Sequence, residues 1–305
     1  MAGFAQSLPF PNEGTVLQRT NLIVRWEASK HPWPKALWTY QMTPMNFSSE
    51  VISNLMVLGS FTEKDKSDRG KDGKVFSNSN GVLMMSSPLE DVMYLVDGNR
   101  ADFDKNVPGT NQLFQLTTNL LPQFGINLSE IPKGKDGRPE IIFTNYKELQ
   151  TAWFYRAIDG VKCDSDIGAG RIDFGQNGRV IEVMFVWRNV RRDKLYAAAT
   201  PKQIVQWIRE GKAALPRGIL GGMGSMIPID WSTVKKVTIK KATAYYWGEF
   251  FLGEREHRPI FPSPVIPYAV LQATIDTGTT NIDVQISCPI IDETKPLKLP
   301  QVKSK

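Results

Sequence analysis

The sequence has little of what enzymes most often use for catalysis. It contains two histidines, His31 and His257, which are far apart and lie near prolines, and two cysteines, Cys163 and Cys288. A Ser-His-Asp or Cys-His site would have to use one of these histidines. No GxSxG motif occurs, and the cysteines do not have zinc-ligand spacing. We therefore expect no enzyme, no metal site and no cofactor.

Long apolar runs are also missing. None approaches the roughly 18 residues that a membrane-spanning helix requires, so we expect no membrane span. The chain is basic, with 37 Lys and Arg against 31 Asp and Glu, but four of the lysines lie in residues 295–305. A nucleic-acid-binding protein gathers its positive charge on one face. We therefore expect no nucleic-acid partner, and we predict a disordered basic tail over residues 293–305.

What is present is an ordinary globular composition. The chain has 305 residues, of which 41% are hydrophobic and 22% are charged, enough for two domains with cores of their own. Apolar residues recur at helical spacing over residues 46–59 and 111–124. A stretch rich in glycine and charge comes after the second of these helices. The predicted organisation is an N-terminal module at 15–130, a linker at 131–148 and a C-terminal module at 149–292.

The fold class is inferred from the faces of the predicted elements. Each helix has a single apolar stripe, and each group of strands has a single apolar face, so helices should pack on one face of a sheet while solvent meets the other. The predicted fold is α+β, with two successive modules of helix packed on antiparallel sheet.

The most regular stretch is residues 154–190, which reads as strands joined by tight turns. Asn177 and Gly178 favour a hairpin turn because both residues tolerate positive φ. In the next strand, alternation places Ile181, Val183, Phe185 and Trp187 on one apolar face. This stretch also holds the candidate site residues, which fall into a basic set and an acidic set. The basic set is Arg156, Arg171, Arg179 and Arg188, continued by Arg191 and Arg192 just beyond the stretch, and the acidic set is Asp159, Asp164, Asp166 and Asp173.

Each set has two interpretations. Converging arginines bind an anionic partner, but charges on the open face of a half-covered sheet give the same pattern. Paired carboxylates can transfer protons or hold calcium, but their spacing does not match an EF-hand loop, and nearby glycines favour turns. Gly221 to Gly224 lack the Lys-Ser/Thr ending of a phosphate loop, and a flexible crossing is the better interpretation.

The cysteines and the N-terminus bear on location. Cys163 and Cys288 could form one disulfide in an oxidising compartment, or they could be two buried thiols. Gly3 and Ala5, followed by Gln6, resemble the end of a signal-peptide cleavage site. We expect an exported protein, in the cell envelope or outside the cell.

Several short motifs carry a family resemblance. Arg156, Asp159 and Gly160 form an R-x-ϕ-D-G turn, Gly168 and Gly170 begin a G-x-G strand, and Asn177, Gly178 and Val180 form an N-G-x-V hairpin. Over residues 150–292 the chain resembles secreted bacterial proteins with PepSY-like or cystatin-like modules, similar to extracytoplasmic accessory proteins of two-component regulators. It departs from them at Cys163 and in the long loop at 216–231. The resemblance implies an exported, non-enzymatic interaction protein without a defined active site.

The residue patterns and the resemblance together leave two functions from different classes. The favoured one is a non-enzymatic binding or scaffold protein that acts through a protein partner, with Arg156, Asp159, Arg171, Arg179 and Arg188 as candidate binding residues. The alternative is a small-ligand-binding protein or hydrolase that uses the acidic turn region from Asp159 to Asp173. The alternative requires polar groups that converge in a pocket.

Overall fold

The fold is that of a computed structural model. It describes residues 19–30, 32–45, 47–67, 74–85, 92–96, 106–146, 149–220, 226–248 and 262–297. The chain divides into two compact units. The hairpin unit comprises residues 41–191 and 247–265, and the long-strand unit comprises residues 1–40, 192–246 and 266–305.

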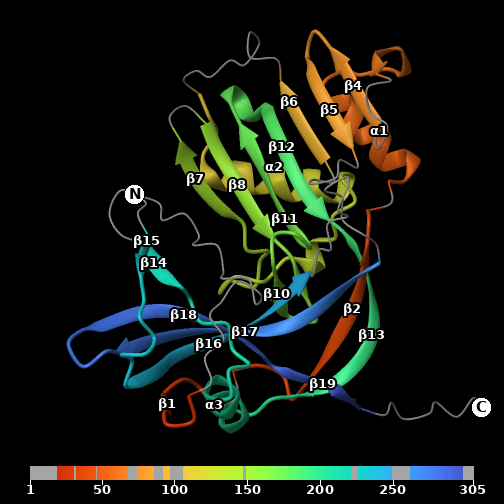
Figure 1. The fold of residues 1–305 in the computed structure, drawn as a ribbon. Helices are drawn as coiled ribbons and strands as arrows, with labels where there is room; N and C mark the ends of the chain where they lie inside the picture. The colour runs from red at the N-terminus through yellow and green to blue at the C-terminus, as the bar shows by residue number, and fades with distance from the viewer. Residues whose placement is uncertain are drawn as a thin grey trace, which may run out of the picture. The chain divides into compact units, whose positions relative to one another are not determined.

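The hairpin unit is built on an antiparallel eight-stranded sheet (Figure 1). Its strands, in spatial order, are β3 (Lys66–Ser67), β4 (Lys74–Asn78), β5 (Gly81–Met85), β6 (Val92–Val96), β12 (Val180–Trp187), β11 (Gly168–Phe174), β8 (Leu149–Tyr155) and β7 (Ile142–Tyr146). Helix α2 (Thr110–Gln123) crosses one face of this sheet, and α1 (Ser49–Leu58) contacts α2. Three single-turn helices, η1 (Glu63–Asp65), η3 (Leu128–Glu130) and η4 (Gln176–Gly178), complete the described helical segments of this unit.

The core of the hairpin unit lies between the helices and one sheet face. Leu55, Leu113 and Leu121 are the fully buried leucines of the two helices, and they share a core with strand residues such as Phe154 and Phe185. The predicted alternation in β12 is confirmed, because the four residues from Ile181 to Trp187 that it assigns to the inner face are all buried.

The local signals for the helices and the turn are largely confirmed. Helix α1 begins after Ser48, whose side chain accepts a hydrogen bond from the Val51 amide. Pro122 is accommodated in the last turn of α2. Asn177 and Gly178 both have positive φ, 55° and 77°, as a tight turn requires.

The long-strand unit is a sheet of mixed direction. Its strands are ordered β19 (Ile291–Pro296), β13 (Asn189–Ala198), β2 (Ala36–Thr43), β17 (Ser263–Asp276) and β16 (Lys236–Gly248). Strand β18 (Asn281–Pro289) pairs with β17, and β1 (Ile23–Trp26) pairs with β16 in parallel. The expectation of purely antiparallel sheets is therefore wrong at β1. A separate hairpin joins β14 (Gly218–Leu220) to β15 (Met226–Pro228) within the predicted loop at 216–231.

Helix α3 (Pro201–Arg209) begins at residues that favour a helix start. Thr200 caps it, Pro201 occupies the first turn, and Gln203 closes a capping box. Ile204 and Ile208 are buried, and the helix contacts β1 and β18.

The fold class α+β holds, but the domain boundaries differ from those predicted. Residues 131–148 are not a linker, because β7 lies within them and pairs with β8 along its whole length. The predicted C-terminal module is divided as well, because β8, β11 and β12 share a sheet with β3 to β6. The reason is long-range pairing: Met184 of β12 lies opposite Met93 of β6. In the predicted tail, β19 extends to Pro296, and residues 298–305 lie outside the described part.

The hairpin unit also contains two short strands around a tight turn. β9 (Ala157–Ile158) and β10 (Val161–Cys163) form a hairpin around Asp159 and Gly160, whose φ angles are 49° and 78°.

None of the helices in the described residues has the length and apolarity that crossing a membrane would need.

Candidate functional site: the open face of the eight-stranded sheet

The face of the eight-stranded sheet opposite the helices carries an unusual row of side chains. Residues that lie opposite one another on successive strands form it, and their order is Val75, Met84, Met93, Met184, Arg171, Trp153 and Ile142. None of them belongs to the hydrophobic core cluster formed by the described residues. Ile142 is 46% exposed, and the others are half-buried. We call this set the cross-strand row.

The register explains how residues distant in the sequence reach one line. Opposite residues of antiparallel strands point to the same face of the sheet. Pairing of β5, β6 and β12 therefore brings Met84, Met93 and Met184 side by side. Pairing of β11 with β8 places Arg171 next to Trp153.

Arg171 is the charged centre of the cross-strand row. Its guanidinium forms an ion pair with Glu182, contacts the Met184 sulfur at 3.3 Å and lies 5.7 Å from the centre of the Trp153 ring. Trp153 in turn donates its indole N–H to Thr144 Oγ1 at 3.1 Å. These contacts orient Arg171 and Trp153 on the sheet, and the Arg171 side chain is still about one-third exposed.

A second row beside the first is apolar at one end and polar at the other. Its residues, in order across the sheet, are Val82, Leu95, Glu182, Asp173, Thr151 and Thr144. Burial raises the pKa of Asp173, and the Glu182 charge raises it further, while a hydrogen bond from Thr151 and the Arg171 charge lower it. The open face thus combines apolar side chains with one compact polar cluster, in which Asp173 and Thr151 are buried.

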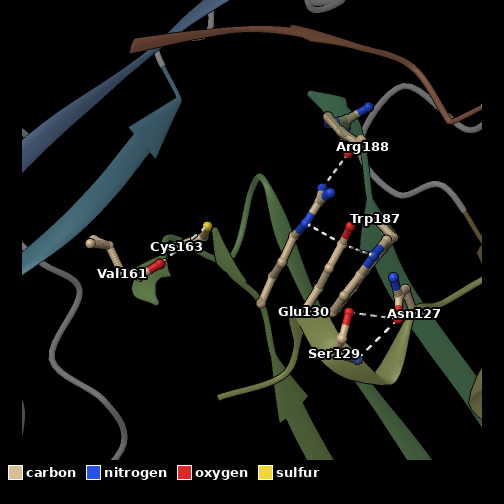
Figure 2. A network of polar contacts seen from close by, with 8 residues as sticks. Asn127, Ser129, Glu130, Val161, Cys163, Trp187 and Arg188 are labelled. Atoms are coloured by element: carbon tan, nitrogen blue, oxygen red, sulfur yellow. Dashed lines mark hydrogen bonds and ion pairs between the residues drawn. The ribbon is translucent and has the colours of Figure 1, made fainter. Parts of the chain in front are cut away.

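Arg156 does not lie on this face, contrary to the prediction of a basic binding surface. It is 4% exposed, and its Nε lies 2.8 Å from Glu130 Oε2. The same carboxylate oxygen accepts the indole N–H of Trp187 at 3.1 Å (Figure 2). The Arg156 guanidinium lies over that ring, 5.4 Å from its centre. Arg156 also donates to the carbonyl of Arg188. It therefore stabilises the interior, and Glu130 is its partner.

Glu130 is presented by the single-turn helix η3. The Asn127 side chain accepts a hydrogen bond from the Ser129 amide and so fixes the start of that turn (Figure 2). The sequence-based interpretation missed Glu130 because it comes from a segment predicted to end one module. The partner of Arg156 lies 26 positions earlier in the chain (156 − 130).

Arg188 is also interior, at 3% exposure, and it organises the acidic loop between β10 and β11. Its Nε donates to the backbone carbonyl of Asp166 at 3.2 Å. The carboxyl of Asp166 has its pKa raised to about 6, first by burial and then by the charge of Asp164, while the Arg188 charge lowers it. Burial also raises the pKa of Asp164.

These shifts predict how stability depends on pH. The folded pKa of Asp166 exceeds its unfolded value, so the folded state favours the neutral carboxyl. Ionisation of Asp166 lowers the free energy of unfolding. This loss is absent below about pH 4 and complete above about pH 6. We expect Asp166→Asn to stabilise the protein by about 2 kcal/mol at pH 8, because partial exposure reduces the penalty, and to change nothing near pH 3.5. Thermal unfolding at the two pH values measures this, with the exposed Glu27→Gln as control. An equal effect at both values would contradict it.

Asp159 and Arg179 are exposed and stand apart from the cross-strand row. Asp159 occupies the β9–β10 turn, on the wall of a cavity of about 840 Å³. Glu130, Lys133, Glu140 and Lys162 also line it. Lys162 pairs with Glu140 at 2.9 Å, and Glu130 is held by Arg156. Two of the acids on the wall, Glu130 and Glu140, therefore already have basic partners.

The predicted acidic cluster is dispersed. Asp159 lies in a turn, Asp164 and Asp166 in the loop before β11, and Asp173 on the open face of the sheet. No group of three or more His, Cys, Asp or Glu residues within the described ranges is placed to hold a metal ion. The two histidines, like Gly221 to Gly224, lie outside those ranges.

The possible disulfide is not formed. Cys163 and Cys288 are both buried free thiols, so of the two alternatives the structure has the second. Cys163 ends β10 in the hairpin unit, and Cys288 lies in β18 of the long-strand unit. Burial raises the pKa of Cys163 to about 12, and burial also raises that of Cys288, so neither thiol is activated at neutral pH.

Comparison with known proteins gives little. No protein-family model matches the sequence, and no curated protein matches it. Similar solved structures include an uncharacterized protein from Eubacterium rectale, with a TM-score of 0.44 and 8% identity over 91% of this chain and 89% of that one. Another is the YpeB C-terminal domain from Bacillus megaterium, with a TM-score of 0.33 and 11% identity over 80% of this chain and all of that one. Both TM-scores are low, and neither likeness carries an argument.

Proposed function

We propose that this chain is a non-enzymatic binding protein, and that it docks a protein partner on the open face of the eight-stranded sheet. The observation that carries the proposal is the cross-strand row, which places half-buried methionines, a tryptophan and an exposed isoleucine outside the core. The solvent face of an antiparallel sheet is usually polar. A contiguous apolar area on a protein surface marks an interaction site.

The residue types support a protein partner. Trp, Met and Arg are enriched where proteins contact one another. Methionine side chains adapt their shape to the surface they meet. Arg171 and Glu182 add a polar centre to the apolar area. The partner that suits this face presents an apolar surface with hydrogen-bonding groups at its middle.

The small-ligand alternative has weaker support. The cavity beside Asp159 has the volume for a ligand. However, Glu130 and Glu140 on its wall are already held by Arg156 and Lys162. A ligand would have to replace these ion pairs. The predicted use of the region from Asp159 to Asp173 as one site has no support, because its carboxyl groups do not face one cavity.

The open face can be tested with one charge. We expect Met93→Glu, at the middle of the cross-strand row, to weaken partner binding at least tenfold, because it buries a new charge in an apolar contact. Val57→Glu is the matched control, because Val57 is 73% exposed on helix α1. The immobilised proteins would capture partners from an envelope extract of the source organism.

The expected result is a partner that wild type and Val57→Glu retain and Met93→Glu loses, with unchanged melting temperatures. Equal capture by Met93→Glu, or the absence of a specific partner for wild type, would contradict the proposal. Export and the likeness to PepSY-like or cystatin-like modules stay predictions, which rest on the N-terminal residues and on the short motifs between Arg156 and Val180.

A further inference from the structure

Strand β7 is the last strand of the eight-stranded sheet, and among the described residues one of its edges has no partner strand. It pairs with β8 at all five of its residues without a bulge. No other strand in the described part of the chain pairs with it. An edge strand presents backbone N–H and C=O groups that can pair with another strand.

The sequence of β7 does nothing to block such pairing. Natural edges are usually blunted by short length, charge, proline or a bulge. Strand β7 reads Ile-Phe-Thr-Asn-Tyr, with no charge and no proline, and its Ile142 is 46% exposed. The opposite edge strand, β3, has two residues, one of them Lys66. In the other large sheet, the end strand β19 contains Asp292, Lys295 and Pro296. The edge of β7 is thus the unprotected one among these.

The register shows which backbone groups face outward. The Arg156 N–H donates to the Gly168 carbonyl at 2.9 Å, so alternation along β8 turns the backbone groups of Leu149 toward β7, where they exchange hydrogen bonds with Tyr146. Bonded and non-bonded positions alternate along an antiparallel pair. Thr144 and Ile142 therefore also bond to β8, and the N–H and C=O groups of Phe143 and Asn145 point away from the sheet.

We propose that β7 pairs antiparallel with β7 of a second copy of this chain, about a two-fold axis at Thr144. Phe143 of each copy then exchanges its outward backbone hydrogen bonds with Asn145 of the other copy. A two-fold antiparallel contact matches a surface with itself. A charged strand would repel its own copy in this arrangement, whereas the five residues of β7 are uncharged. This inference goes beyond the proposed function and does not depend on it.

The contact is small, so the dimer should be weak. Each copy contributes an edge of five residues, which buries less area than a standard stable interface. We therefore expect a dissociation constant on the order of 10–100 µM. Sedimentation velocity on the full chain, from about 1 to 500 µM, covers this range. Wild type should shift from monomer to dimer as the concentration rises.

Two substitutions at one position give the decisive comparison. Asn145→Pro removes an outward N–H, and proline is tolerated on edge strands. Asn145→Ala removes the same exposed side chain and keeps the N–H. We expect Pro to weaken dimerisation at least tenfold and Ala to leave it unchanged. If the proline variant fails to fold, Asn145→Lys tests the same edge by placing a charge on it.

A wild type that stays monomeric to about 500 µM overturns the inference, and so does a folded Asn145→Pro that dimerises like wild type. The failure of this inference is separable from that of the proposed function. Met93→Glu addresses the open face alone and should dimerise like wild type.

Discussion

Replacing Arg156 with alanine should destabilise the protein by about 3 kcal/mol. Arg156 is buried, and its guanidinium neutralises Glu130 while stacking over Trp187. Its removal leaves the Glu130 carboxylate, whose side chain is only one-third exposed, with the neutral indole N–H of Trp187 as a partner and no cation to balance its charge. An uncompensated charge in such surroundings is costly. Chemical denaturation at pH 7 measures the loss.

The matched control for Arg156→Ala is Arg138→Ala. Arg138 lies 3.9 Å from Asp136, but both side chains are about two-thirds exposed. Exposed ion pairs contribute little, so we expect a change below about 1 kcal/mol. The double variant Arg156→Ala/Glu130→Gln should lose less than the two single losses combined, because the groups interact directly. Additive losses would show that the pair does not act as a unit.

Gly170→Ala should destabilise the hairpin unit by about 3 kcal/mol. An added Cβ would lie 2.4 Å from Cζ of Phe154 and 2.5 Å from Cβ of Phe185. Phe185 Cβ is fixed to its backbone in β12, so the clash cannot be relieved by a side-chain rotation alone. Strand β11 would have to move away from its neighbours. Thermal and denaturant unfolding of the variant measure the cost.

Gly109→Ala is the control for this effect. An added Cβ at Gly109 meets nothing within 4 Å, and its φ of −63° suits any residue. We expect a loss below about 1 kcal/mol from the weaker helix cap. If Gly170→Ala were as mild as Gly109→Ala, the close approach of β11 to Phe154 and Phe185 would be wrong.

Much of the local structure could be predicted because the signals are local. The capping box at Thr200 and Gln203, the turn at Asn177 and Gly178, and the alternation in β12 all depend on residues a few positions apart. Each has a physical cause that acts within one turn or one strand. The turn and the alternation, which the sequence analysis predicts, are confirmed at the positions named.

The arrangement of these elements could not be predicted in the same way. A charged, glycine-containing stretch near residue 135 suggests a linker, but residues 142–146 directly after it form β7 and join a sheet by pairing with β8. Burial of Arg156 and Arg188 has no signal in the sequence either, because the acid and the carbonyls that satisfy them come from other segments. Only the pairing of distant strands reveals the neighbours of these residues.

The candidate site was predicted in part. Arg171 lies on the open face, as one of the two interpretations of the arginines required, whereas Arg156 and Arg188 do not. The alternation in β12 by itself places Glu182 and Met184 away from the core. The contributions of Met84, Met93 and Trp153 come from three other strands, and their alignment depends on register across the whole sheet.

The division of the chain between the two units dictates an order of events during synthesis. The hairpin unit draws all of its described eight-stranded sheet from residues 66–187, so a ribosome delivers that sheet complete before β13 and all later strands exist. The long-strand unit cannot close until β17 and β18 emerge, because β17 lies between β2 and β16 in its sheet. Strands β1 and β2 are made first among the described residues and wait longest for their partners. A newly made chain thus carries unpaired strand edges until translation is nearly finished. During this period the unpaired edges expose the chain to aggregation.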